Sequence, residues 1–224
     1  MSRWLFFPSA TTASDIISNG LIVHLDAGNS SSYPGSGTTW TDLSSEGNDG
    51  TLVNGPTFTS DDGGSLVFDG INDYVNLGAV QVNTAAGTIG MWVKLDSVAG
   101  RFFGRGGNFE SRFSSTRLVI DMTGNSVTSS RTSWSGAWLY VVIGWDENAN
   151  STAIYVNGVS DATGTCSTIS TKTGDMNIGR SSGMGGGGGL YVPGKIAAFH
   201  SYNRLLTTTE IQSNFDTTKT RFGL

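Results

Sequence analysis

The sequence has few charged residues, one cysteine and no cluster of basic side chains. Charged residues make up 14% of its 224 residues, and the formal net charge is −5. Proteins hold nucleic acid by neutralising its phosphates with basic side chains, so we expect no nucleic-acid partner. Because Cys166 is alone, a disulfide framework and a thiolate metal cluster are both excluded.

Long apolar segments are also missing. No stretch approaches the ~20 apolar residues that a membrane-spanning helix requires, so we expect no membrane partner. The N-terminal apolar run covers only four residues, which is too short for the apolar core of a signal peptide. It consists of Trp4, Leu5, Phe6 and Phe7.

Glycine, serine and threonine are abundant, together forming over a third of the chain, whereas glutamate occurs four times. This composition disfavours long helices and favours short strands joined by turns. Apolar and polar residues alternate in several segments, and Asn157-Gly158 is a strong signal for a hairpin turn. The sequence therefore predicts an all-β fold, a two-sheet antiparallel jelly-roll β-sandwich, with strands in 21–26, 88–95, 116–122, 138–145, 151–156, 176–180 and 195–202.

One short helix is expected near the C-terminus. Thr207 and Glu210 have the spacing of a capping box, in which each side chain accepts a hydrogen bond from the other residue's backbone N–H. Ile211 and Phe215, four residues apart, would form the apolar stripe of about three helical turns.

Residues 1–18 differ from the remainder, with an apolar tip followed by small polar residues. We interpret them as an extended N-terminal arm, and residues 19–224 as one domain. An arm that is ordered must rest on something, which favours a contact with a neighbouring subunit and a homo-oligomer. Trp4, Leu5, Phe6 and Phe7 are the assembly contact that this interpretation predicts.

From Gly20 to the C-terminus, successive segments resemble laminin-G-like, or concanavalin A-like, jelly-roll domains. The segments include SLVFDGINDYVNLG, TIGMWVKLDS, WLYVVIGWDENANSTAIYVNG and GKIAAFHSYNRLLTTTEIQSNF, in that order. The family's Phe-Asp-Gly…Asp-Tyr-Val signature is carried by Phe68, Asp69, Gly70, Asp73, Tyr74 and Val75. The chain departs from the family pattern in the final strand, where Ala197-Ala198 replaces the usual acidic pair.

Two stretches, HLDAGNSSSYPGSGTTWTDLS and YNRLLTTTEIQSNFDTTKTRFGL, resemble variants found in structural proteins of tailed phages that infect cyanobacteria. This resemblance implies a non-enzymatic virion protein, a capsid decoration or a tail or neck appendage, that docks on other virion proteins through the arm. The alternative is a carbohydrate-binding module that attaches to host-surface glycans.

The glycine-rich stretch between Ser181 and Phe199 partly matches a phosphate-binding P-loop. The match fails at Ile196, where a P-loop requires the serine or threonine that binds Mg²⁺, and the following residues look like a strand. The glycine run 185–189 is therefore interpreted as a surface loop.

No catalytic residues are expected. Gly179–Gly183 spells the G-x-S-x-G pattern, but that motif requires a strand–turn–helix elbow, and only His24 and His200 could serve as its base. Laminarinase-type enzymes of this fold use closely spaced glutamates, whereas no two glutamates here lie within 30 residues.

Calcium is the only candidate cofactor, and no other cofactor is expected. Relatives often bind it at the edge of the sandwich, and Asp69, Asn72 and Asp73 are the residues that could supply oxygen ligands. The alternative, which we favour, is that these side chains hydrogen-bond to the backbone of their own turn.

Sugar binding would use exposed aromatic residues. Tyr191, Trp134 and Trp40 lie in segments expected to be loops and are the residues that could stack on a sugar ring. Tryptophan is equally suited to a jelly-roll core, and the sequence does not decide between these roles.

Overall fold

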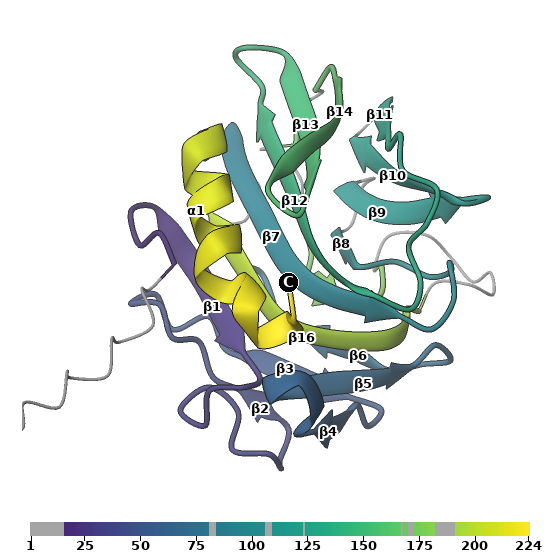
Figure 1. Ribbon diagram of the computed structural model, residues 1–224. Helices are drawn as coiled ribbons and strands as arrows, with labels where there is room; N and C mark the ends of the chain where they lie inside the picture. Colours follow the sequence, from purple (N-terminus) through teal and green to yellow (C-terminus); the bar gives the residue numbers. More distant parts are fainter. Residues whose placement is uncertain are drawn as a thin grey trace, which may run out of the picture.

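The computed structural model describes residues 16–80, 84–105, 109–122, 124–166, 168–169, 173–181 and 191–224. Trp4, Leu5, Phe6 and Phe7 and the glycine run 185–189 lie outside the described residues. Two antiparallel β-sheets face each other, and one α-helix lies on the outside of one of them (Figure 1). The predicted all-β jelly-roll sandwich with one short C-terminal helix is confirmed.

Sheet A has eight strands in the order β14-β13-β12-β7-β16-β5-β4, with β1 also paired to β16. Its long central strands bury side chains on both faces, as predicted for the segment 138–145. The strands are β1 (Leu21–Asp26), β4 (Thr57–Thr59), β5 (Ser65–Asp69), β7 (Ala86–Leu95), β12 (Trp138–Asp146), β13 (Ser151–Val156), β14 (Val159–Gly164) and β16 (Pro193–Tyr202).

Sheet B also has eight strands, in the order β11-β10-β9-β8-β15-β6-β3-β2. They are β2 (Thr39–Trp40), β3 (Gly50–Val53), β6 (Tyr74–Asn76), β8 (Phe103–Arg105), β9 (Phe109–Ser114), β10 (Arg117–Met122), β11 (Asn125–Thr128) and β15 (Met176–Ile178). The inner faces of the two sheets enclose one large apolar core, which includes Leu25 of β1, Met91 of β7 and Ile120 of β10.

The outer face of sheet A is covered by the C-terminal segment. Figure 1 shows α1 (Thr208–Thr218) lying across β1, β16 and β7, and the 3₁₀-helix η2 (Lys219–Phe222) continues it. Trp92 of β7 packs between this segment and sheet A, with its ring centroid 4.1 Å from that of Phe222 and 5.8 Å from that of Phe215. A second apolar cluster therefore binds helix to sheet.

The predicted capping box starts α1. The Thr207 side chain accepts a hydrogen bond from the Glu210 backbone N–H, and Glu210 Oε2 accepts one from the Thr207 N–H at 2.8 Å. Two hydrogen bonds from Arg204, at 2.9 and 2.6 Å, lower the pKa of Glu210 to about 2. Ile211 and Phe215 face the sheet, as predicted.

The residues just before β1 are attached to this helix. Ile16 is buried, and the Ile17 N–H donates a hydrogen bond to Asn214 Oδ1 of α1 at 2.8 Å. No helix among the described residues is long and apolar enough to cross a membrane.

The Ala197-Ala198 pair lies at a β-bulge in β16. Ile196 pairs with Val93 and Ala198 with Trp92, so Ala197 is an extra residue in the ladder between β16 and β7. The bulge returns Phe199 to the core and turns Ala198 to the outer face, beneath the C-terminal segment. Small side chains here leave room for Trp92 and Phe222.

Candidate functional site

The outer face of sheet B carries a row of residues that are polar except for one glycine, and no described helix covers it (Figure 1). Each residue of the row lies opposite the next on the neighbouring strand, so the row crosses the sheet from β11 to β3. The residues next to the row in the sequence, such as Ile120, Met176 and Val75, point into the core. The row consists of Ser126, Asp121, Glu110, Gly104, Asn177, Asn76 and Thr51.

Two ion pairs occupy one end of this row. Glu110 is bound by Arg101, and Asp121 is bound by Arg112 through Nε and, at 3.2 Å, through Nη2. The Glu110 side chain is only 5% exposed, so its charge is largely removed from water and depends on the arginine. These four residues, with Gly124 and the start of β11, line a cavity of about 350 Å³.

The middle of the row is closed in by the segment that follows β15. Gly104 lies directly beneath Ser181, where any Cβ would clash with the serine. Asn177 is fully buried, and its Oδ1 has no hydrogen-bond partner among the described residues. Asn76 donates a hydrogen bond to Asp175 Oδ2 at 2.9 Å.

An aromatic side chain lies on the same face. The guanidinium carbon of Arg180 is 3.7 Å from the centre of the Tyr74 ring, a close cation–π contact. Tyr191 is half-buried, and its carbonyl contacts Gly100, next to Arg101. The face thus combines carboxylates, guanidinium groups, amides and aromatic rings, which together can donate and accept several hydrogen bonds.

Two of the three aromatic residues predicted to bind sugar are buried. Trp40 is 0% exposed and Trp134 is 1% exposed, so neither offers a ring face to a ligand. Trp134 packs against Phe102 and Phe113, and its Nε1 donates a hydrogen bond to the Arg131 carbonyl. Trp134 lies in a loop as expected, whereas Trp40 lies in β2; both have the core role that the sequence had left open, and neither is exposed.

Asp69, Asn72 and Asp73 form a tight turn. Asp69 Oδ1 accepts hydrogen bonds from the N–H groups of Ile71, Asn72 and Asp73, and the bond from Ile71 is the main cause that lowers the pKa of Asp69. Asp73 Oδ2 accepts from the Asp69 N–H, while burial raises the pKa of Asp73. Among the described residues, no group of three or more histidine, cysteine or acidic side chains could hold a metal ion.

The other two motifs do not have the geometry that their chemistry requires. Gly194 and Lys195 lie inside strand β16, so they cannot form a P-loop before a helix. Ser181 lies over sheet B, whereas His24 and His200 pair on the outer face of sheet A, between β1 and β16.

The residues that line the cavity on sheet B were not identified from the sequence. Glu110 and Asp121 lie opposite one another because β9 and β10 form a hairpin around Ser115 and Thr116. Ser115 has a φ of +55°, a conformation that glycine or asparagine adopts more readily. If this hairpin turn had been recognised in the sequence, Glu110 and Asp121 would have been predicted to lie opposite one another.

The fold, with a polar cavity on the outer face of sheet B, defines a lectin-like β-sandwich. A laminin G family profile, described as the concanavalin A-like lectin/glucanases superfamily, matches residues 69–212. The chain belongs to this superfamily. A search of curated proteins finds no significant match.

Several solved structures share the fold. Domain 4 of AbnA, a GH43 extracellular arabinanase from Geobacillus stearothermophilus in complex with arabinotriose, has a TM-score of 0.69 at 16% identity. That match covers 88% of this chain and 99% of the arabinanase domain. The binding domain of Paraclostridial Mosquitocidal Protein 1 matches with a TM-score of 0.67 at 12% identity, over 88% of this chain and 52% of that domain.

A sialidase of Trypanosoma rangeli, solved as a covalent intermediate, matches with a TM-score of 0.65 at 16% identity. The match covers 90% of this chain and 33% of the sialidase. This chain therefore spans about half of the toxin binding domain and a third of the sialidase, and these likenesses concern the fold alone.

Proposed function

We propose that this chain is a non-catalytic glycan-binding domain whose ligand lies along the outer face of sheet B, and that it is displayed on the particle of a tailed phage. The observation that carries the glycan proposal is the polar row that crosses sheet B on a face that no described helix covers. The ligand would occupy the end of the row on β9, β10 and β11, where the cavity of about 350 Å³ lies.

The chemistry of the row supports a sugar ligand. Sugar hydroxyls both donate and accept hydrogen bonds. On the outer face of sheet B, the carboxylates and guanidinium groups of the cavity lie beside the amides of the rest of the row. Ligand sites commonly fix orientation with a few such groups. The arabinotriose complex of an arabinanase domain with this fold supports the same assignment.

Glu110 and Asp121 form a pair of carboxylates, as the catalytic residues of glycosidases do. The ion pairs that they make with arginine distinguish this site from a glycosidase active site. Retaining glycosidases place two carboxyl groups about 5 Å apart, one to donate a proton and one to attack the sugar. Here each carboxylate is bound by its own arginine, through one oxygen of Glu110 and both oxygens of Asp121, which favours the charged form over a proton donor. We propose that this pair binds hydroxyl groups and does not cleave.

The expected result is specific oligosaccharide binding by the purified domain on a glycan array, with the bound sugar recovered uncleaved. Asp121→Asn should weaken binding at least tenfold, about 1.4 kcal/mol, because the charge that orients Arg112 is lost. Asp216→Asn is the matched control, since Asp216 lies on α1 and away from sheet B.

Two results would contradict the proposal. One is a blank array with protein shown to be folded, with and without calcium. The other is sugar turnover that Asp121→Asn abolishes.

The virion setting is supported by the two phage-like stretches and by the apolar N-terminal residues. Deleting residues 2–15 spares Ile16 and Ile17, which contact the domain. We expect the truncated protein to fold but to be missing from particles, because a four-residue apolar tip can contribute roughly 1.5–3 kcal/mol per buried side chain to docking. Immunogold labelling of intact particles checks this. Normal incorporation of the truncated protein would rule out docking through the arm.

A further inference from the structure

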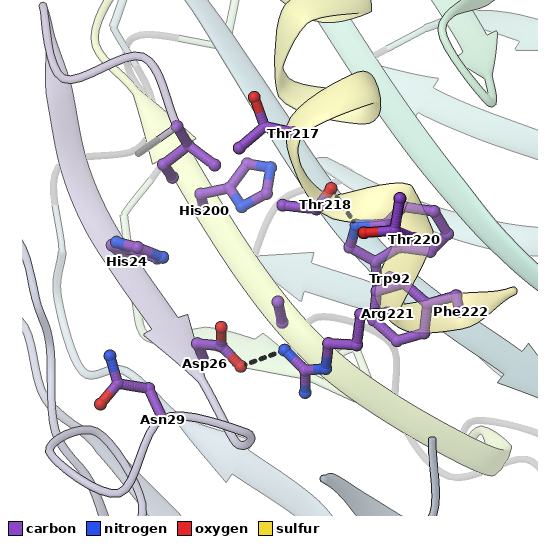
Figure 2. A pocket seen from close by; sticks show the side chains of 12 residues that line it. His24, Asp26, Asn29, Trp92, His200, Thr217, Thr218, Thr220, Arg221 and Phe222 are labelled. Carbon is purple, nitrogen blue, oxygen red and sulfur yellow. Dashed lines mark hydrogen bonds and ion pairs between the residues drawn. The ribbon is translucent and has the colours of Figure 1, made fainter. Parts of the chain in front are cut away.

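A second cavity lies on the opposite side of the molecule from the polar row. It has a volume of about 290 Å³ and lies between β1, β16 and the C-terminal end of α1 (Figure 2). Residues from the start of the domain and from its last turn meet here, since Asp26 and Arg221 form an ion pair at the cavity. This volume is close to the lower end of the roughly 300–1,000 Å³ range of small-ligand pockets.

His200 of β16 presents an unsatisfied polar atom to this cavity. Its Nε2 shares a 2.6 Å hydrogen bond with the Tyr140 hydroxyl, and the missing side chain of Gly90 makes room for that contact. Nδ1 has no hydrogen-bond partner in the part of the chain that the structure describes, although the residue is only 2% exposed. Figure 2 shows the ring extending from β16 toward Thr217 and Thr218. A buried nitrogen of this kind costs stability unless something binds it.

The charges around the cavity balance. Arg221 Nη1 donates a 2.6 Å hydrogen bond to Asp26 Oδ1, drawn as a dashed line in Figure 2, so the two charges neutralise each other. Burial, followed by the proximity of His24, lowers the pKa of His200 to about 3, which keeps its ring uncharged. The cavity therefore suits a neutral ligand better than an anion or a cation.

The floor of the cavity is apolar and its rim is polar. Ala198 and Trp92 form part of the floor, while Asn29 and Thr220 are exposed at the rim. The alanine keeps the cavity open, because a larger side chain at this position of the bulge would project into it. A sugar ring has this same division between apolar C–H groups and hydroxyls.

We propose that this cavity is a second binding site, independent of sheet B, which takes one neutral sugar residue or a similarly small polyol. The ligand's hydroxyls would bond to His200 Nδ1, Asn29 and Thr220, and its C–H face would rest on Ala198 and the edge of Trp92. Such a site goes beyond the oligosaccharide face, because it recognises a single unit and lies on the other sheet.

Long-range ¹H–¹⁵N spectra of the histidine rings in the full chain test this site. The probes are glucose, galactose, mannose, arabinose and glycerol, with glucuronate and glucosamine as charged counterparts. We expect at least one neutral probe to shift the His200 ring nitrogens saturably. Ala198→Leu should abolish the shift, and Asn29→Ala should weaken binding at least fivefold.

Asn29 is exposed, so its variant remains informative if Ala198→Leu fails to fold. Asp121→Asn, which alters the face of sheet B, should leave the His200 shift unchanged, so failure of the two sites can be told apart. The proposal is overturned if no neutral probe shifts His200 in the folded protein, if only a charged probe does, or if Asp121→Asn removes the effect.

Discussion

Replacing Trp92 with alanine is expected to lower the free energy of unfolding by about 3–5 kcal/mol. Trp92 is fully buried, stacks on Phe222 and Phe215, and lies with its ring centroid 5.3 Å from that of Tyr140. Its Nε1 also donates a 2.8 Å hydrogen bond to Thr218 Oγ1, so its loss frees the end of α1 from sheet A. Urea denaturation followed by circular dichroism measures the change.

Val159→Ala is the control for this experiment. Val159 is an apolar residue of the same sheet but is 67% exposed, so its loss should change stability by less than about 0.5 kcal/mol. Trp92→Phe keeps the stacking and loses the hydrogen bond, so it should lower the free energy of unfolding by more than Val159→Ala and less than Trp92→Ala. If Trp92→Ala cost no more than Val159→Ala, the helix would not be held by this cluster.

Acidification from pH 7 to pH 4 is expected to cost about 3 kcal/mol of stability through His200 alone. Burial, with a smaller contribution from His24, lowers the pKa of His200 from 6.5 to about 3 in the folded protein. At a pH between these two pKa values, His200 binds a proton in the unfolded chain but not in the folded chain. Stability is therefore complete above pH 6.5 and is lost as the pH falls toward 3.

Tyr140 and Tyr202 both lie beside His200 and do not titrate in this window. Burial raises the pKa of Tyr140 well above its usual range and does the same for Tyr202, so both stay neutral. Denaturant titrations at several pH values should show this slope in the wild type and a much flatter one in His200→Gln. Equal slopes in the two proteins would contradict the assignment to His200.

A different group acts in more acidic solution. The pKa of Glu210 is lowered to about 2 by Arg204, so its contribution is present above pH 4.5 and is lost only as the pH falls from there toward 2. The two windows overlap only below about pH 4.5, so the slope measured above pH 5 contains no contribution from Glu210.

Local signals in the sequence predicted local structure well. Asn157 and Gly158 both have positive φ, as the hairpin between β13 and β14 requires, and the capping box at Thr207 starts α1. Alternation within the strand expected over 88–95 predicts that Met91 and Trp92 lie on opposite faces, and the two residues do belong to the two different apolar clusters. What alternation could not show is that a helix from the end of the chain would cover that face.

The candidate site depends on contacts between residues on different strands, which sequence patterns do not reveal. Glu110 and Asp121 meet because of a two-residue turn at Ser115, which lacks the asparagine and glycine that usually mark such turns. Trp134 lies between strands in the sequence but is buried by Phe102 and Phe113. Position in a loop does not determine exposure when aromatic side chains from other strands reach it.

The most direct test of the account is to map the bound glycan by the shifts of backbone amide resonances, using the oligosaccharide that the array identifies. We predict that saturable shifts follow the polar row of sheet B, at Asp121, Glu110 and Asn177 and on the strands β10, β9 and β15 that carry them. Shifts confined to the outer face of sheet A or to the loops, with none on these three strands, would contradict the claim that this face binds the glycan.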